Sequence, residues 1–248
     1  DIAEEIGRLY GYHNLVSTLP IGATKRGEYI GDVKIRKEIS KRLRNLGLNE
    51  CKTYTLTSPD AAKLFKYDNR ENITLPNAMS VDKSVIRTTI LPSLLNVYDY
   101  NKARTVKDIC LYEIAKTYDV NYQEELKVAL LMKGNYITNE WQRHILKVDF
   151  YLIKGIVENL LDYLGFKNRY SFVKEEIDSL HPGMSAGIYL DREKIGIIGR
   201  VHPSIKKDEI YMCELSVKAL FEKQVKPLKF KEASNKKKNR FILAFKEL

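Results

Sequence analysis

The stretch "LHPGMSAGIYLDREKIGIIGRVHP", residues 180–203, contains two His-Pro pairs and four of the chain's 13 glycines. Three interpretations compete: a phosphate-binding loop, a metal site on His181 and His202, or a β-hairpin. A phosphate-binding loop needs its glycines directly before a helix, whereas these lie among alternating apolar residues, where glycine usually marks a bulge or close packing. Two histidines without a third ligand make a weak metal site. We therefore predict a hairpin with strands at 186–191 and 194–201, with a His-Pro pair marking each end.

The two strands of this hairpin show the alternation that a half-buried sheet requires. A short polar loop at 191–193 joins them. On this register Ile188 and Leu190 share one face, and Ile195 and Ile197 share a face on the returning strand. The stretch therefore predicts a pair of antiparallel strands with apolar residues directed to a core.

The spacing of apolar residues, together with glycine and proline at the ends of the apolar segments, predicts helices and further strands on either side of this hairpin. Proline directly after Leu91 suits the entrance of a helix, and Gly47 and Gly165 suit helix ends. The expected helices cover 1–12, 32–46, a segment from 91, and 150–164; the further strands cover 51–59, 108–120, 126–132, 170–174 and 209–215. Separated helices and hairpin-joined strands predict an α+β fold with an antiparallel sheet.

The composition is that of a globular protein with a strong basic excess. The chain has 248 residues, 30% charged and 44% hydrophobic, and a formal net charge of +10. No run reaches the roughly 18 apolar residues of a membrane span, and three scattered cysteines indicate reduced thiols in the cytoplasm. A basic excess attracts polyanions such as nucleic acids, although nine of the lysines and arginines lie between Lys223 and Lys246.

Three stretches, in order along the chain, together resemble the β subunit of bacterial phenylalanyl-tRNA synthetase. The first is "DIAEEIGRLYGYHNL" (1–15), similar to the end of that subunit's small helical module. The second, "LPNAMSVDKSVIRTTILPSLL" (75–95), resembles the family's Asn-Pro-Met-Ser and Ser-x-x-Arg-Thr-x-x-Leu-Pro-x-Leu-Leu runs, with Ala78 in place of a proline. The third is the 180–203 stretch itself.

The resemblance implies a class II aminoacyl-tRNA synthetase-like fold, in which helices flank an antiparallel sheet. It also implies a domain plan. Residues 1–20 are then the end of the helical module, 21–31 a linker, 32–228 the catalytic-like domain, and 229–248 a basic tail that matches nothing in the family.

The resemblance further implies a domain with the fold of a synthetase and without its chemistry. Active class II enzymes place an arginine after the strand of the second motif, where its planar fork binds carboxylate and phosphate oxygens. Here that strand ends in Tyr118 and Asp119, and an acid at this place repels ATP. The third-motif arginine has no counterpart, since Gly199 and Arg200 lie on a predicted strand. We therefore expect no catalytic residue in this chain.

A scaffold role is what the resemblance then predicts. In the family this subunit supports a catalytic α subunit that uses ATP to charge tRNA(Phe), within a cytoplasmic heterotetramer. The first class II motif, at 32–58, packs at the subunit interface in such an enzyme. We accordingly expect its apolar stripe of Ile35, Ile39 and Leu43 to contact the α subunit, although the stripe is equally suited to cover the chain's own sheet.

A magnesium site is a further implication of the resemblance. Asp1, Glu4 and Glu5 match acids that bind Mg²⁺ in the family, and these positions share one face of a helix. Carboxylate oxygens suit this hard cation. The helix dipole also favours acids at a helix N-terminus when no metal ion is bound. Because further ligands lie upstream in the family, we expect no Mg²⁺ at these three residues in this chain.

Two other functions stay open at the level of sequence. The runner-up is a free-standing nucleic-acid-binding module that uses the basic surface, including Lys25 and Arg26. A stand-alone enzyme built on Glu113, Asp119 or the histidines is the weaker alternative, because no catalytic triad or acid–base pair accompanies them.

Overall fold

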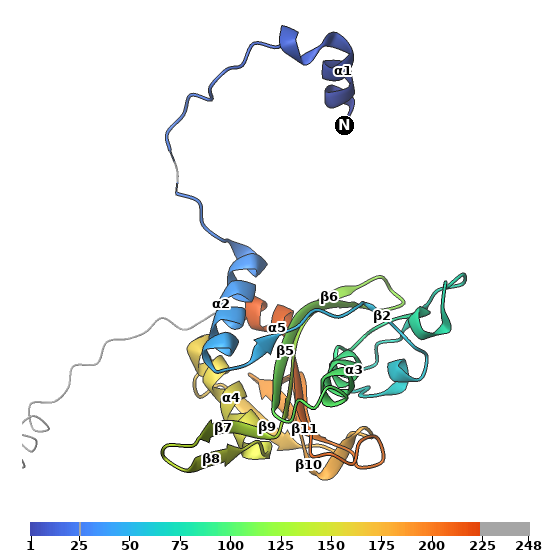
Figure 1. The fold of residues 1–248 in the computed structure, drawn as a ribbon, viewed down its shortest axis with the longest axis vertical. Coiled ribbons are helices and arrows are strands. Elements are labelled where there is room, and N and C mark those ends of the chain that lie inside the picture. Colours follow the sequence, from blue (N-terminus) through green and yellow to red (C-terminus); the bar gives the residue numbers. More distant parts are fainter. Residues whose placement is uncertain (25, 224–248) are drawn as a thin grey trace, which may run out of the picture. The chain divides into compact units, whose positions relative to one another are not determined.

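The computed structural model describes residues 1–24 and 26–223, which form two compact units, one of residues 1–30 and one from Gly31 onward (Figure 1). The predicted basic tail at 229–248 and Lys25 lie outside the described residues. Among the described residues no helix is both long and apolar enough to cross a membrane.

The first unit consists of one amphipathic helix and a short 3₁₀ turn. Helix α1 (Ile2–Tyr10) occupies most of the predicted segment 1–12 and ends at Gly11, whose φ of +92° suits glycine. The backbone N–H of Gly11 donates to the carbonyl of Gly7 and closes the last turn of the helix. The 3₁₀ helix η1 follows at Tyr12–Asn14.

The second unit is built on a seven-stranded sheet. Six of its strands pair antiparallel and one short strand, β1, pairs parallel with β5, so the predicted α+β class and antiparallel sheet are confirmed. The order across the sheet is β1 (Asn49–Glu50), β5 (Ile109–Tyr118), β6 (Glu124–Lys133), β12 (Tyr211–Ser216), β11 (Glu193–Val201), β10 (Leu180–Leu190) and β9 (Tyr170–Lys174).

Each face of this sheet has its own cover and its own apolar core. Helices α2 (Gly31–Asn45), α4 (Phe150–Tyr163) and α5 (Val217–Glu222) cover one face (Figure 1). Helix α3 (Leu91–Lys102) covers the other, beside the small sheet β2 (Leu56–Thr57), β4 (Val85–Ile86) and β3 (Ile73–Thr74). Short 3₁₀ turns η2 (Ala61–Lys63) and η3 (Val81–Lys83) lie in the same 51–90 segment.

Local sequence signals account for where helices α4 and α3 begin and for where α4 ends. Asp149 caps α4 by accepting the N–H of Leu152 at 2.7 Å, and Gly165 follows the helix with a φ of +90°. Proline at the second position of α3 sits where its missing N–H costs nothing. Both predicted helices are confirmed because these end signals bracket a regular apolar stripe.

The 180–203 hairpin is confirmed, but its first strand begins at Leu180 and contains the first His-Pro pair, which was predicted to mark the strand's end, and its loop is tighter than predicted. Asp191 and Arg192 alone form the turn, both at positive φ, and Glu193 already pairs with Leu190. A register shift after Ile188 adds one residue to the returning strand.

This shift overturns the prediction that Ile195 and Ile197 share a face. Ile195 packs in the core under α4, whereas Ile197 packs in the core under α3. The reason is that a bulge inserts one unpaired residue and reverses the alternation from there on.

Two further parts of the chain differ from the prediction. The strand expected at 51–59 is a strand only at β2, and residues 51–54 run extended beside β5 without forming one. A separate hairpin of β7 (Asn135–Asn139) and β8 (His144–Lys147) forms its own two-stranded sheet, which the sequence analysis missed. It projects from the second unit, at the lower left of that unit in Figure 1.

Candidate functional site

A layer of buried charged side chains lies on the sheet face that α3 covers. Successive residues of a strand point to opposite faces, so Glu113 on β5, Lys127 on β6 and Glu214 on β12 all join the side that carries Leu131 and Met212. Each of the three charged residues is at most 1% exposed. Buried charges persist only when they are paired and hydrogen-bonded, and the 53–90 segment supplies those partners.

Glu113 is held by two residues of that segment. Its Oε1 accepts the backbone N–H of Thr53 at 3.0 Å and Nη2 of Arg87 at 3.1 Å, and its Oε2 accepts the Thr53 hydroxyl at 2.6 Å. Arg87 is itself 2% exposed, and its Nη1 donates to the hydroxyls of Thr53 and Ser93. Three hydrogen bonds from Thr53 and Arg87 therefore hold the buried carboxylate.

Glu214 closes the layer on the other side. Its Oε1 accepts the Thr89 hydroxyl at 3.0 Å and the Ile90 N–H at 2.6 Å. Its Oε2 accepts the hydroxyl of Tyr67 at 2.8 Å and Nζ of Lys127 at 3.3 Å. Burial lowers the pKa of Lys127, but the surrounding carboxylates outweigh burial and hold that pKa above its ordinary value.

Asp119, which stands where the resemblance calls for an arginine, belongs to the turn between β5 and β6. Its Oδ1 accepts the backbone N–H groups of Gln123 at 3.0 Å and Asn121 at 2.9 Å. The Gln123 hydrogen bond is the main reason that the pKa of Asp119 lies below its ordinary value. Arg70 lies 3.6 Å from the other oxygen and also binds Glu125 at 2.8 Å. Asp119 is thus engaged in local structure.

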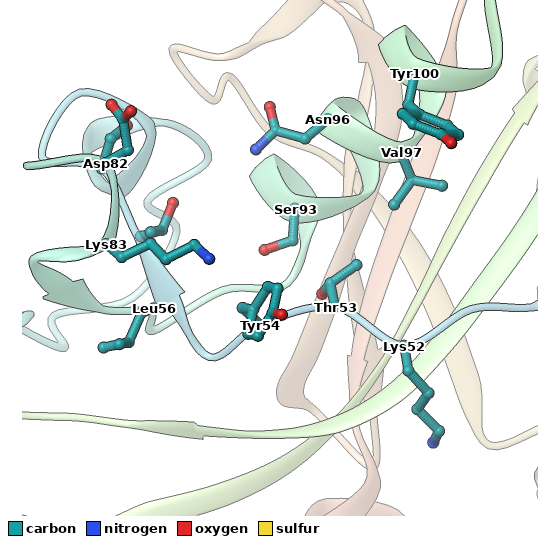
Figure 2. Close-up of a pocket in the computed structure, with 12 residues that line it drawn as sticks. Lys52, Thr53, Tyr54, Leu56, Asp82, Lys83, Ser93, Asn96, Val97 and Tyr100 are labelled. Carbon is teal, nitrogen blue, oxygen red and sulfur yellow. The ribbon is translucent and has the colours of Figure 1, made fainter. Parts of the chain in front are cut away.

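A hollow of about 760 Å³ opens beside this layer, between residues 52–58 and α3 (Figure 2). Thr53 and Ser93, the two hydroxyl groups that bind Arg87, are among its lining residues. Tyr54 stands at its rim with 72% of its surface exposed, and Nζ of Lys83 lies 4.1 Å from the centre of its ring. The other lining residues are Lys52, Leu56, Thr57, Ser58, Asp82, Asn96, Val97 and Tyr100.

Comparison with known proteins assigns the family. The model of the phenylalanyl tRNA synthetase beta chain CLM domain matches residues 15–217. The chain belongs to this family. It is 37% identical over 237 residues to the phenylalanine–tRNA ligase beta subunit of Bacillus subtilis, and 36% identical over 240 residues to that of Shouchella clausii. Each alignment covers 92% of this chain and 30% of the relative, so the chain spans about a third of their length.

Solved structures agree on the fold. The pyrrolysyl-tRNA synthetase of Desulfitobacterium hafniense superposes with a TM-score of 0.57 at 15% identity, over 76% of this chain and 67% of that one. At that identity the likeness concerns the fold alone. It supports the aminoacyl-tRNA synthetase-like arrangement expected from the beta-chain family.

The apolar stripe predicted as a partner contact is used within the chain. Ile39 and Leu43 are completely buried in the core between α2, α4 and the sheet, and Ile35 is partly buried against the same core. Ile39 and Leu43 are therefore used by the chain's own core, and a contact of the partly buried Ile35 with an α subunit stays a prediction. The alternative, that the stripe covers its own sheet, is what the structure contains.

The three acids that match magnesium ligands of the family lie at the start of α1, and their role as Mg²⁺ ligands stays a prediction. Asp1, Glu4 and Glu5 are all exposed, and Glu5 is engaged by Arg8 at 2.7 Å. Within residues 1–24 and 26–223 no group of three His, Cys, Asp or Glu side chains is placed to hold a metal ion. His181 and His202 each accept a backbone N–H two residues further along, which is a local turn interaction.

The sequence alone does not predict most of the buried layer. It offers Glu113 as a candidate catalytic acid and Arg87 as part of the 75–95 motif, and it gives Thr53, Lys127 and Glu214 no site role. One signal was present: a single charged residue inside a strongly apolar strand, as in "LKVALLM" and "MCELS". Such a residue predicts burial with a partner, although it does not say which partner.

Proposed function

We propose that this chain is a non-catalytic scaffold region of a phenylalanine–tRNA ligase beta subunit, which holds a catalytic α subunit during ATP-dependent charging of tRNA(Phe). The family assignment supplies the subunit. The scaffold role rests on the buried layer, because its cations and carboxylates are paired with one another: Arg87 binds Glu113 and Lys127 binds Glu214. Nε of Arg87 is the one buried nitrogen of these pairs that has no hydrogen-bond partner among the described residues.

The chemistry of amino-acid activation supports this assignment. Joining a carboxylate to the α-phosphate of ATP brings two anions together, and a catalyst needs preorganised cations that face them. Here the buried cations face inward: Arg87 is bound to Glu113, and Lys127 is bound to Glu214. Neither side chain can turn toward a nucleotide without leaving a buried carboxylate unpaired, which typically costs about 3–5 kcal/mol.

The hollow of Figure 2 is the surface that we assign to the α subunit. It is lined by residues 52–58, the end of the segment that resembles the interface-forming first motif of class II enzymes. Tyr54, Val97 and Tyr100 offer apolar and aromatic surface there, and Lys52 and Lys83 add charge at its edge. Aromatic anchors beside charged rims are typical of protein interfaces.

Co-purification with an α subunit tests this assignment. Tyr54→Asp should prevent assembly while the variant still folds, because Tyr54 is largely exposed in the free chain and a new carboxylate would be desolvated in the complex. Tyr151→Asp is the matched control, since Tyr151 is a 77% exposed tyrosine on α4, at the opposite face of the sheet. Assembly that tolerates both variants equally would remove the hollow from the interface.

The cofactors and the cellular location that we propose are those of the whole ligase. ATP would be used by the α subunit, and Mg²⁺ would need ligands beyond Asp1, Glu4 and Glu5, which do not form a site by themselves. Three free cysteines fit a cytoplasmic protein. A free-standing nucleic-acid-binding module is the second candidate, and it is disfavoured because most of the chain matches one domain of a ligase subunit.

A further inference from the structure

The β7–β8 hairpin exposes the chain's single tryptophan in an unusual way. Trp141 lies in the turn between the two strands and is 99% exposed. Trp is a large aromatic residue that is highly buried on average, so complete exposure at the end of a projecting element indicates a surface that meets something else.

The base of this hairpin is firmly attached to the rest of the unit. The Tyr136 hydroxyl donates to the carbonyl of Leu46 at 2.6 Å, and the Asn135 N–H donates to Oδ1 of Asp108 at 2.7 Å. The Val148 N–H closes the base on Gly134 at 2.9 Å. A two-stranded hairpin alone is marginally stable, and these bonds hold the tip in a defined position.

The charges along the hairpin are predominantly positive. Residues 135–147 contain one acid, Glu140, against Arg143, Lys147 and the titratable His144. Among the described residues neither Arg143 nor Lys147 forms an ion pair, so both cations are free to meet an external anion.

The aliphatic side chains of the hairpin do not form a protein-docking patch. Ile137 pairs across the strands with Leu146, and Thr138 pairs with Ile145. Cross-strand partners share a face and neighbours along a strand do not, so Leu146 and Ile145 lie on opposite faces. Protein contact sites usually present one contiguous apolar patch. A second copy of the chain is disfavoured as well, because both copies carry a net charge of +10.

We propose that the β7–β8 hairpin binds a single-stranded segment of RNA, with one base stacked on Trp141 and backbone phosphates held by Arg143 and Lys147. An aromatic platform at the turn and free cations along the same hairpin, with Lys147 at its base, are the combination that single-stranded nucleic acids require, since every base has a face that stacks and every linkage carries a charge. The choice of a tRNA as the RNA rests on the proposed function; the stacking surface itself goes beyond the scaffold role.

The single tryptophan allows a direct test. The chain is labelled with 5-fluorotryptophan, so one ¹⁹F resonance reports on residue 141 alone, and a transcript of tRNA(Phe) is titrated in. The resonance should shift and lose its sensitivity to exchange of H₂O for D₂O as the indole leaves solvent. A resonance that stays unchanged at saturating RNA, or one that moves only when a purified α subunit is added, overturns the proposal.

Binding constants from fluorescence anisotropy of labelled RNA give the second test. Trp141→Ala should weaken binding roughly 5- to 100-fold, which is the effect of removing one base–aromatic stack, and Trp141→Phe should retain most of the affinity. Tyr122→Asn is the control, because Tyr122 is an exposed tyrosine on another turn and asparagine tolerates its positive φ. Equal losses for Trp141→Ala and Tyr122→Asn would contradict the stacking role.

The salt dependence separates specific phosphate contacts from general attraction. Arg143→Gln with Lys147→Gln should reduce the slope of log K against log salt by about 1.4, since each single-strand phosphate contact contributes about 0.7. Lys34→Gln with Lys41→Gln removes the same charge from exposed positions of α2 and should leave the slope nearly unchanged. If both pairs lower it equally, the binding is non-specific and the hairpin is not the site. None of these variants touches the hollow of Figure 2, so assembly with the α subunit stays an independent measurement.

Discussion

Replacing Glu214 by glutamine removes one negative charge from the centre of the buried layer and keeps the shape of the side chain. The amide oxygen can still accept the Thr89 hydroxyl and the Ile90 N–H, as Oε1 does. The amide nitrogen, however, would face Nζ of Lys127 and the Tyr67 hydroxyl in place of Oε2. The loss therefore falls on Lys127, which is 1% exposed and cannot regain water.

The size of the effect follows from that burial. Removing one partner of a buried ion pair typically costs about 3–5 kcal/mol, and Asp68 and Glu125 at 3.4 and 3.7 Å from Nζ place this pair toward the lower end. Because a domain is commonly stable by only about 5–15 kcal/mol, urea unfolding followed by circular dichroism should show a much lower midpoint with an unchanged m value. Glu158→Gln, in the surface pair with Lys154, is the control and should cost about 0.3–0.5 kcal/mol.

A second variant and the pH dependence of stability test the Lys127–Glu214 ion pair. Adding Lys127→Met to Glu214→Gln should recover part of the loss, because the stranded charge is then gone. Since the pKa of Lys127 is raised in the folded chain, its stabilising contribution is complete below the pKa of an unfolded lysine, about 10.4. It disappears as the pH rises through the folded value. If Glu214→Gln stays within about 1 kcal/mol of the parent chain, well below the cost of breaking a buried pair, the layer is not a tightly coupled ion pair.

Four shorter predictions concern other parts of the chain. Gly196→Ala should destabilise by about 1–3 kcal/mol or more, because its Cβ would lie 2.0 Å from the carbonyl oxygen of Glu214; thermal unfolding measures this. Arg192→Gly should raise the free energy of urea unfolding by up to about 1 kcal/mol, since it relieves a side chain held at φ +71°. Asp119→Arg should leave pyrophosphate exchange with phenylalanine and ATP at background, because one restored cation does not rebuild an activation site. In the folded chain iodoacetamide at pH 8 should react slowly with all three thiols, because a thiol with a raised pKa forms little thiolate. Burial is the main cause in each case: it raises the pKa of Cys51 to about 12, that of Cys110 to about 11, and that of Cys213 well above its ordinary value.

The sequence motifs of this chain predict its family better than they predict the roles of single residues. The stretches 1–15, 75–95 and 180–203 identified the family together, because all three resemble it and occur in the same order along the chain. The sequence left two roles open for Ile39, since an apolar stripe has the same pattern whether it faces a partner or the chain's own sheet. The acids Asp1, Glu4 and Glu5 likewise share a helix face, a pattern that a helix N-terminus favours with or without a cation.

The sequence by itself determined the elements whose causes are local. The cap, the apolar stripe and Gly165 predict helix α4, and the alternation and polar loop predict the 180–203 hairpin. These signals suffice because dihedral preferences and side-chain period act over a few residues. Only the tertiary structure decided how distant side chains meet. Glu214 finds its partners between 87 and 147 residues earlier in the chain. The bulge at Ile195 moves Ile197 to the other core. Such outcomes depend on the register between strands and on the order of strands in the sheet, which no single segment specifies.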